Sequence, residues 1–290
     1  MSENAMQKQV PLGRKENSVR FEEGDGESIR ISSAYLQRRR KDRITQAILV
    51  IGGIVLLLGL WQAVVWVGQY PSYILPSPAR VYDRFMRLML SERLWMHVGV
   101  TLSEVFAGLG LGLIVAFLLG YGVAKSRTLE RVLSPYIIAS QAIPIVALAP
   151  LLVIWFGFGR FSKVLVCALV VFFPILVNTV VGLRSVEREW KDLMRSLEAT
   201  RWQMFTKLEL PAALPVLFGG LKVGVTLSVI GAVVGEFVGA DRGLGFLVNL
   251  GQGLLDTPLM FVAILVLVVI ALGLYGLVSI LEGWLLNWRS

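Results

Sequence analysis

Charged residues, cysteine and histidine are scarce in this sequence. Asp, Glu, Lys and Arg account for 17% of its 290 residues, while hydrophobic residues account for 56%. Soluble domains contain about 25% charged and about 45–50% apolar residues, so the composition excludes an ordinary soluble protein and indicates an integral membrane protein. The single cysteine, Cys167, excludes a disulfide framework.

The patterns of an enzyme or a nucleotide-binding protein are also missing. The sequence contains no phosphate-binding loop of the form GxxxxGKS or GxxxxGKT. Its apolar runs show no nucleophile beside a base and no paired carboxylates, which argues against an intramembrane enzyme. The single histidine, His97, makes no metal constellation, and we expect it at a membrane interface. The net charge of +8 does not indicate nucleic acid, because the basic residues flank apolar runs.

Six apolar runs are each long enough for a transmembrane helix, which needs about 20 residues. We therefore predict an all-α integral membrane protein with about six transmembrane helices. The runs cover residues 44–67, 104–125, 132–159, 164–183, 211–238 and 259–281. Residues 1–43 are polar and basic without periodicity, so we expect a disordered cytoplasmic tail there and a membrane domain over 44–290.

Prolines interrupt two parts of the chain. Pro76 and Pro78 precede apolar positions spaced as on an amphipathic helix, which we expect at the membrane interface. The third apolar run holds Pro135, Pro144 and Pro150, so we expect a broken helix whose freed carbonyls face protein or a wet cavity. The stretch before Pro144 is therefore a candidate lining of a pathway, and a kinked packing helix is an equally good interpretation.

The distribution of Lys and Arg indicates the orientation of the chain. With the N-terminus inside, most basic residues, including the cluster at 38–43, fall in cytoplasmic segments. The opposite orientation would place most of them outside, against the positive-inside rule. We therefore expect a cytoplasmic N-terminus, with residues 187–211 on the cytoplasmic side.

Residues 187–211 form the longest charged segment between the apolar runs. Leu193, Leu197, Phe205 and Leu208 recur in it at roughly helical spacing. An amphipathic helix here would lie across the ends of the spans and could dock into a groove on another protein. The plainer interpretation is a surface loop between two spans.

Within this segment an acidic residue, Asp192, is followed by Ala199, Leu208 and Leu210-Pro211 at a characteristic spacing. The spacing resembles the EAA loop of the membrane subunits of binding-protein-dependent ABC importers. In this resemblance Asp192 corresponds to the glutamate of the motif, and Leu210-Pro211 matches its last two residues. Glu198 departs from the pattern, because the family has a glycine at that position.

The resemblance implies a type I ABC importer fold whose cytoplasmic coupling helix contacts an ATPase. The ATPase-coupling residues that it implies are Asp192, Arg195, Ser196, Leu197, Glu198, Ala199, Thr200, Trp202, Leu210 and Pro211. It further implies that this chain is a transport subunit without enzymatic activity and without a cofactor. ATP and Mg would bind to separate ABC nucleotide-binding subunits, and transport would proceed by ATP-driven alternating access.

The same resemblance implies further partners and a location. Members of the family work with a second permease subunit, expected here as a homodimer, and with an extracytoplasmic solute-binding protein. The expected location is the bacterial or archaeal cytoplasmic (inner) membrane, where the lipid bilayer surrounds the spans. Nucleic acid is not an expected partner.

Two stretches of the sequence are similar to the permeases for thiamine-precursor pyrimidines and for riboflavin. One ends in Trp155-Phe156-Gly157, and the other, VIGAVVGEFVGADRGLG, covers 229–245. We therefore expect a heteroaromatic vitamin or vitamin precursor as the solute. Nitrate, taurine or sulfonates are the alternative solutes, and a self-contained secondary transporter or channel is the alternative function. Candidate pathway residues are Gln141, Pro144, Phe172, Asn178, Lys222 and Glu236.

Overall fold

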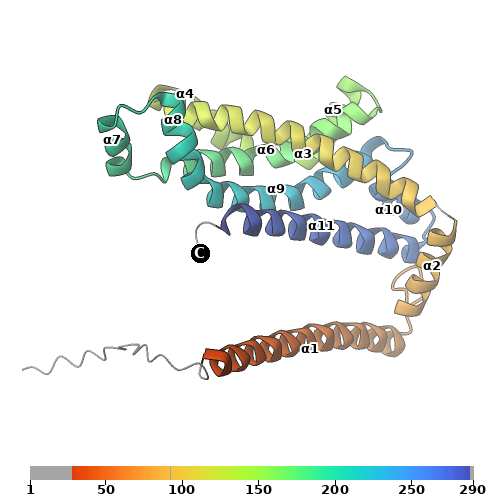
Figure 1. Ribbon diagram of the computed structural model, residues 1–290. Coiled ribbons are helices and arrows are strands. Elements are labelled where there is room, and N and C mark those ends of the chain that lie inside the picture. The colour runs from red at the N-terminus through yellow and green to blue at the C-terminus, as the bar shows by residue number, and fades with distance from the viewer. Residues whose placement is uncertain (1–27, 92, 288–290) are drawn as a thin grey trace, which may run out of the picture. The chain divides into compact units, whose positions relative to one another are not determined.

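The computed structural model describes residues 28–91 and 93–287, and this part of the chain consists of helices and loops without a β-strand (Figure 1). Five helices are long and apolar enough to cross a membrane, and a bent pair of shorter helices makes a sixth if it counts as one span. The prediction of an all-α membrane protein with about six spans is therefore confirmed.

The chain divides into two compact units, residues 1–60 and 61–290. The boundary falls within α1 (Ser28–Gly68), whose apolar part forms the first span. The helix also covers residues 28–43, where we predicted a disordered tail. Residues 36–41 are Leu, Gln, three Arg and Lys, and these residue types favour continuation of the helix beyond the span. The rest of the expected tail, residues 1–27, lies outside the described residues.

The short helix α2 (Pro78–Leu90) matches the amphipathic helix predicted after the first span. Ser77 caps its first turn, where a proline is tolerated because that turn needs no N–H donor. Val81 and Leu88 are buried on one side of α2, in the same apolar cluster as residues of α11 (Thr257–Leu285). The amphipathic pattern is therefore used for packing against a neighbouring helix.

Three long helices form the centre of the larger unit: α3 (Arg93–Lys125), α6 (Arg160–Arg184) and α9 (Leu210–Gly239). Small residues allow them to approach closely, as expected for membrane helices. A Cβ atom added to Gly112 would lie 2.8 Å from a backbone oxygen of α6, and one added to Gly231 would lie 2.7 Å from a backbone Cα of α6. Larger side chains at these positions would force the helices apart.

The third apolar run is broken as predicted, into α4 (Arg127–Gln141) and α5 (Ile145–Phe156), which are bent by 95°. The break falls at Pro144, which is the N-cap of α5. Pro135 and Pro150 remain inside the two helices. Of the three prolines, one therefore causes the break.

The last two helices are α10 (Leu244–Gly253) and α11, and α10 packs against both α9 and α11. Gly243, just before α10, has φ +120°, a conformation that glycine adopts without steric cost. The side chain of Asp256 accepts a hydrogen bond from the Leu259 N–H at 3.1 Å and caps α11. Because α11 extends past the predicted end at residue 281, it carries Glu282.

Between α6 and α9 lie α7 (Arg188–Ser196), α8 (Arg201–Met204) and a π-helical turn (Phe205–Glu209) that runs directly into α9. Pro211 lies in the first turn of α9, as expected. It has no N–H to donate, so the helical hydrogen-bond ladder loses one bond beside the wider π-helical turn. The helix α8, the π-helical turn and α9 therefore form one uninterrupted helical stretch.

Candidate functional site

Residues 187–211, called the coupling segment below, contain α7, a tight turn, α8 and the π-helical turn. Two hydrogen bonds of a Schellman motif end α7. The Ala199 N–H donates to the Met194 oxygen at 3.0 Å, and the Glu198 N–H donates to the Arg195 oxygen at 2.9 Å. This turn places Glu198 at φ +54°, in the left-handed region of backbone conformation.

Glu198 thus occupies the position of the Schellman motif that usually holds glycine. A side chain in the left-handed conformation costs about 1–2 kcal/mol relative to glycine. The geometry gives a physical reason for the glycine of the EAA pattern, since that residue must adopt a positive φ. In this chain the turn is retained although glutamate replaces the glycine.

The other side of the turn is held by a capping box at Thr200. The Gln203 N–H donates to the Thr200 hydroxyl at 3.3 Å, and the Thr200 N–H donates to the Gln203 side-chain oxygen at 2.8 Å. Phe205 then packs edge-on against Tyr121 of α3 and also lies near Trp202, with ring centroids 5.3 and 6.0 Å apart. These contacts attach α8 to the bundle.

An apolar row on α7 is exposed. Trp190, Leu193 and Leu197 follow one another at spacings of three and four residues, which places them on one face of the helix and its C-terminal turn. Their exposed fractions are 55%, 49% and 68%. Because the surrounding residues of the segment are charged, this row is a surface that a partner could cover.

The predicted coupling residues fall into two groups. Asp192 and Arg195 form an exposed ion pair of 2.8 Å, and the Ser196 hydroxyl donates to the Asp192 carbonyl at 3.0 Å. Like these three, the residues from Leu197 to Trp202 lie on α7, the turn and α8. Leu210 and Pro211 lie in the first turn of α9 and are half-buried, so they shape the start of the span.

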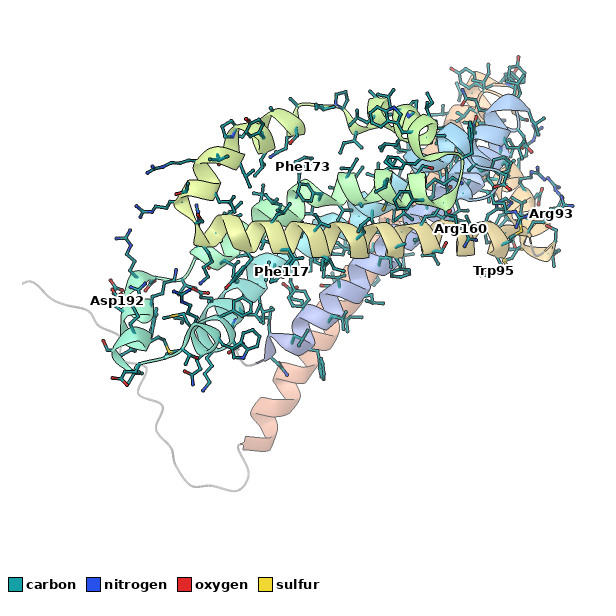
Figure 2. The ribbon with its side chains drawn as sticks, turned by 90° about the horizontal axis from the view of Figure 1, so that it is seen from above. Arg93, Trp95, Phe117, Arg160, Phe173 and Asp192 are labelled. Atoms are coloured by element: carbon teal, nitrogen blue, oxygen red, sulfur yellow. The ribbon has the colours of Figure 1, made fainter. Side chains whose placement is uncertain are left out.

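Two of the candidate pathway residues, Gln141 and Asn178, line one cavity of about 380 Å³ beside the break between α4 and α5. Phe173 also lines it, and Figure 2 shows Phe173 between α6 and the bent pair. Phe172 contacts Phe173 with ring centroids 4.9 Å apart. Pro144 forms the break and is not among the lining residues. The cavity is therefore a polar and aromatic site at a discontinuous span.

The other two candidates lie elsewhere. Lys222 forms an ion pair with Glu282 of α11, and its ammonium nitrogen lies 5.6 Å from the ring centre of Tyr275. Lys222, a charged residue within the predicted span 211–238, therefore pairs with a residue just beyond the predicted end of the last span at 281. Glu236 is buried inside the bundle, with 1% of its surface exposed.

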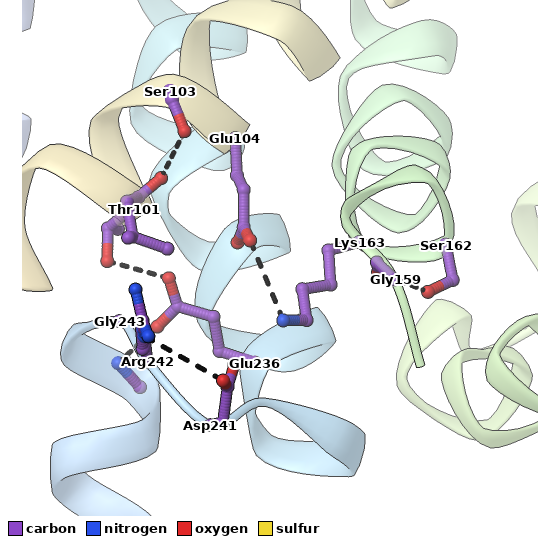
Figure 3. Close-up of polar contacts among 12 residues, drawn as sticks. Thr101, Ser103, Glu104, Gly159, Ser162, Lys163, Glu236, Asp241, Arg242 and Gly243 are labelled. Atoms are coloured by element: carbon purple, nitrogen blue, oxygen red, sulfur yellow. Dashed lines mark hydrogen bonds and ion pairs between the residues drawn. The ribbon is translucent and has the colours of Figure 1, made fainter. Parts of the chain in front are cut away.

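Glu236 belongs to a buried group that we call the polar cluster: Thr101, Glu104, Lys163, Glu236 and Gly243 (Figure 3). The Thr101 hydroxyl donates to the Glu236 carboxylate at 2.6 Å, and the Gly245 N–H donates to the same carboxylate. In addition, the Leu244 N–H donates to the Thr101 oxygen at 2.8 Å. These bonds join α3, α9 and the start of α10.

His97 extends this arrangement, because its Nδ1 atom accepts a hydrogen bond of 2.9 Å from the Gly243 N–H. Its side chain is buried and stacks on Phe246, with ring centroids 5.9 Å apart. Packing of α10 against α3 covers the ring, and its position at a membrane interface stays a prediction. The histidine accepts a hydrogen bond from the turn that begins α10.

A pair of carboxylates is also present, which the sequence analysis did not find. Glu104 and Glu236 are both 1% exposed and lie in the same cluster with one ammonium group, that of Lys163, whose nitrogen is 3.7 Å from a Glu104 oxygen. These residues belong to three different helices. One signal in the sequence could have indicated this cluster: Glu104 and Lys163 lie at the edges of apolar runs. We took both residues for span boundaries.

Comparisons with known proteins agree with this architecture. The model of a family described as binding-protein-dependent transport system inner membrane component matches residues 108–287. The chain is 51% identical to the riboflavin transport system permease protein RibX of Chloroflexus aurantiacus over 237 residues, which cover 82% of this chain and 88% of that protein. It is 38% identical to the formylaminopyrimidine transport permease protein ThiX of Halalkalibacterium halodurans, over 81% of this chain and 94% of that protein.

Among solved structures, an inward-facing conformation of the MetNI methionine ABC transporter aligns with a TM-score of 0.58. The alignment covers 68% of this chain and 97% of the solved chain. At 19% sequence identity, this likeness shows a shared fold alone. About two thirds of this chain therefore share the fold of a chain of an ABC transporter already solved.

Proposed function

This chain belongs to the family of binding-protein-dependent transport system inner membrane components and is a permease of an ABC importer, and we propose that it imports riboflavin or a similarly flat heteroaromatic compound. Membership of the family sets aside the alternative of a self-contained secondary transporter or channel. As a member, the chain has ATPase and solute-binding subunits as its partners.

The 51% identity to a permease named for riboflavin carries the substrate proposal. A second relative, 38% identical, is named for a pyrimidine, so two of the relatives are named for nitrogen heterocycles. The cavity beside the broken span fits such a solute, because pockets for small molecules measure about 300–1,000 Å³. Phe173 offers an aromatic face, and Gln141 and Asn178 offer amide groups that can bind ring nitrogens and oxygens.

The exposed apolar row of the coupling segment supports ATPase docking. A short helix with Trp190, Leu193 and Leu197 on one face is suited to a hydrophobic groove of a partner. We place this contact on the nucleotide-binding subunit, which would hold ATP and Mg. The Schellman turn at Glu198 and the capping box at Thr200 fix the angle between α7 and α8, so a push on α7 would be transmitted to α9.

The assembly that we propose is a homodimer of this chain with two ATPase subunits and an extracytoplasmic binding protein, in the cytoplasmic membrane of a bacterium or archaeon. The N-terminus and the coupling segment would be cytoplasmic, in agreement with the distribution of Lys and Arg. ATP binding would bring the coupling segments together and open the pathway outward, and hydrolysis would restore the inward-facing state.

Co-purification tests the coupling proposal. Leu197→Asp should reduce the amount of ATPase that co-purifies with the tagged chain, because a carboxylate cannot enter an apolar groove without loss of its hydration. Leu254→Asp is the matched control, since Leu254 is equally exposed but lies between α10 and α11. If the ATPase co-purifies unchanged with Leu197→Asp, the exposed row is not the docking surface.

Uptake by proteoliposomes that contain the purified complex and its binding protein tests the substrate proposal. Radiolabelled riboflavin should accumulate when ATP is present, and unlabelled riboflavin should compete more strongly than formylaminopyrimidine or taurine. Gln141→Ala and Asn178→Ala should lower uptake while the complex still hydrolyses ATP. Competition by taurine without any by riboflavin would refute the heteroaromatic assignment.

A further inference from the structure

A cavity of about 700 Å³ lies between the coupling segment and the end of α3. Its cationic lining residues are Lys125 of α3, Lys191 and Arg195 of α7, and Arg201 of α8. Tyr121 and Glu209 also line it. The lining therefore carries four cationic side chains and one acidic side chain.

The positive charge of this cavity is compensated only in part. The Lys125 ammonium binds both oxygens of the buried Glu209 carboxylate at 2.6 Å, and Arg195 pairs with Asp192. Among the described residues, Lys191 and Arg201 have no carboxylate within ion-pair distance. Two cations thus face one cavity without a counter-ion, which is the chemistry of an anion site.

An apolar groove lies about one helical turn further along α3. Leu113 and Phe117 line the groove, while Tyr121 and Lys125 line the cavity, and these four residues follow one another at intervals of four. Residues four apart lie on one side of a helix, at about 1.5 Å of rise per residue. The opposite wall of the groove includes Leu217 of α9. Figure 2 shows Phe117 on the side of α3 that faces α9.

We propose that the cavity and the groove together bind one anionic phospholipid. The phosphate would lie between Lys191 and Arg201, and an acyl chain would lie along Leu113, Phe117 and Leu217. Lys125 is the last residue of the apolar helix α3, so we expect the cavity at the depth where headgroups meet the hydrocarbon core. A lipid at this position would contact α3, α7, α8 and α9, the helices that join the coupling segment to the spans.

The groove is the reason to assign a lipid instead of a soluble anion or an acidic segment of the ATPase. Its lining is almost entirely apolar, with Thr179 as its sole hydroxyl-bearing residue. A free phosphate would use only the cavity, and a protein segment docked on α7 would have no reason to enter the bilayer. A charged headgroup and an acyl chain fit both parts at once.

Native mass spectrometry of the full-length chain, purified in detergent and mixed with phosphatidylglycerol and phosphatidylcholine in equal amounts, tests the proposal. The attraction of two cations to an anionic headgroup should make the chain retain phosphatidylglycerol about thirtyfold more strongly than phosphatidylcholine. The double variant Lys191→Gln/Arg201→Gln should bring retention of the two lipids close to parity. The control Arg188→Gln/Lys207→Gln removes the same charge from exposed positions of the coupling segment that do not line the cavity, and its preference should persist.

A second variant, Leu217→Trp, tests the groove by filling it. It should weaken retention of phosphatidylglycerol although every cation remains, and monodisperse elution on gel filtration verifies that each variant is folded. If millimolar inorganic phosphate displaces the lipid and Leu217→Trp has no effect, the site binds a soluble anion and the proposal fails. It fails equally if Lys191→Gln/Arg201→Gln reduces ATPase co-purification but leaves lipid retention unchanged.

Discussion

The two ends of α9 are held by different kinds of polar contact. At the end next to α10, Thr101, Glu236 and Gly243 form hydrogen bonds that are buried and link α3, α9 and α10. At the end next to α7, the ion pairs Lys125–Glu209 and Arg184–Glu130 have partly exposed members. Apart from the Lys125–Glu209 pair, the hydrogen bonds within the coupling segment join residues at most five positions apart.

This difference explains how one bundle can be rigid at one end and available to a partner at the other. Buried hydrogen bonds between distant helices are lost only if the helices separate, so they hold α3, α9 and α10 in one arrangement. Local hydrogen bonds of an exposed segment open and close independently of the bundle. We expect the α10 end to govern stability and the α7 end to govern coupling.

The largest effect should follow from removal of the Glu236 carboxylate. In Glu236→Leu the Thr101 hydroxyl and the Gly245 N–H lose their acceptor while they stay buried, and each unpaired donor costs about 1–3 kcal/mol. The folded state should lose about 2–6 kcal/mol, measured by thermal unfolding in detergent. Asp241→Ala, at an exposed position, is the control and should change stability by less than about 0.5 kcal/mol. Equal stability of both variants would mean that the buried bonds do not hold this end.

A methyl group at Gly243 should also destabilise the end of α9 next to α10, through a steric clash. Its φ of +120° strains any other residue, and an added Cβ atom would overlap the Glu236 carboxylate. Gly243→Ala should therefore destabilise the protein by about 2–4 kcal/mol. Gly253→Ala, where a Cβ atom meets open space, should be tolerated in the same unfolding measurement. A stable Gly243→Ala protein would show that the turn before α10 can move.

In the middle of α9, a charge swap should show that partly exposed ion pairs contribute less to stability than the buried hydrogen bonds. Lys222→Glu places two carboxylates together on α9 and α11, so it should lower the melting temperature by a few degrees, less than Glu236→Leu does. The double variant Lys222→Glu/Glu282→Lys restores opposite charges and should recover more than half of that loss. No recovery would mean that Lys222 acts through Tyr275 or through the pathway.

The smallest effect should be an increase in the local stability of the coupling segment. Glu198→Gly relieves the left-handed strain and should stabilise the turn by about 1–2 kcal/mol, without a change in global unfolding. Amide hydrogen exchange at Glu198 and Ala199 measures this directly, because their N–H groups form the Schellman bonds. A matching rise in global melting temperature would contradict the independence of the two ends.

Reasoning from the sequence predicts that the spans exist but does not place the first residue of every helix. Each apolar run became a helix, and Pro144 marks the break in the third. The starts of two helices were placed too late, because we took Glu104 and Lys163 for span boundaries. In the structure the two side chains lie close together inside the bundle, so their helices continue past them, to Arg93 and Arg160.

The candidate sites show the same limit. The contiguous pattern of the coupling segment predicts a helix, which the structure contains as α7, because helical contacts join neighbouring residues. In the pathway set, Gln141 and Asn178 line one cavity, while Lys222 and Glu236 lie in other surroundings. The roles of Thr101 and His97 as hydrogen-bond partners of α10 have no local sequence signal.

Composition and the length of the apolar runs, by themselves, determine that this chain is a helical membrane protein, because a backbone in lipid must satisfy its own hydrogen bonds. Local spacing likewise determines the coupling segment. Only the tertiary structure decides which ionisable side chains meet, such as Glu104 with Lys163 and Lys222 with Glu282. These partners are about sixty residues apart in sequence, and only the packing of separate helices brings their charged atoms within a few ångströms.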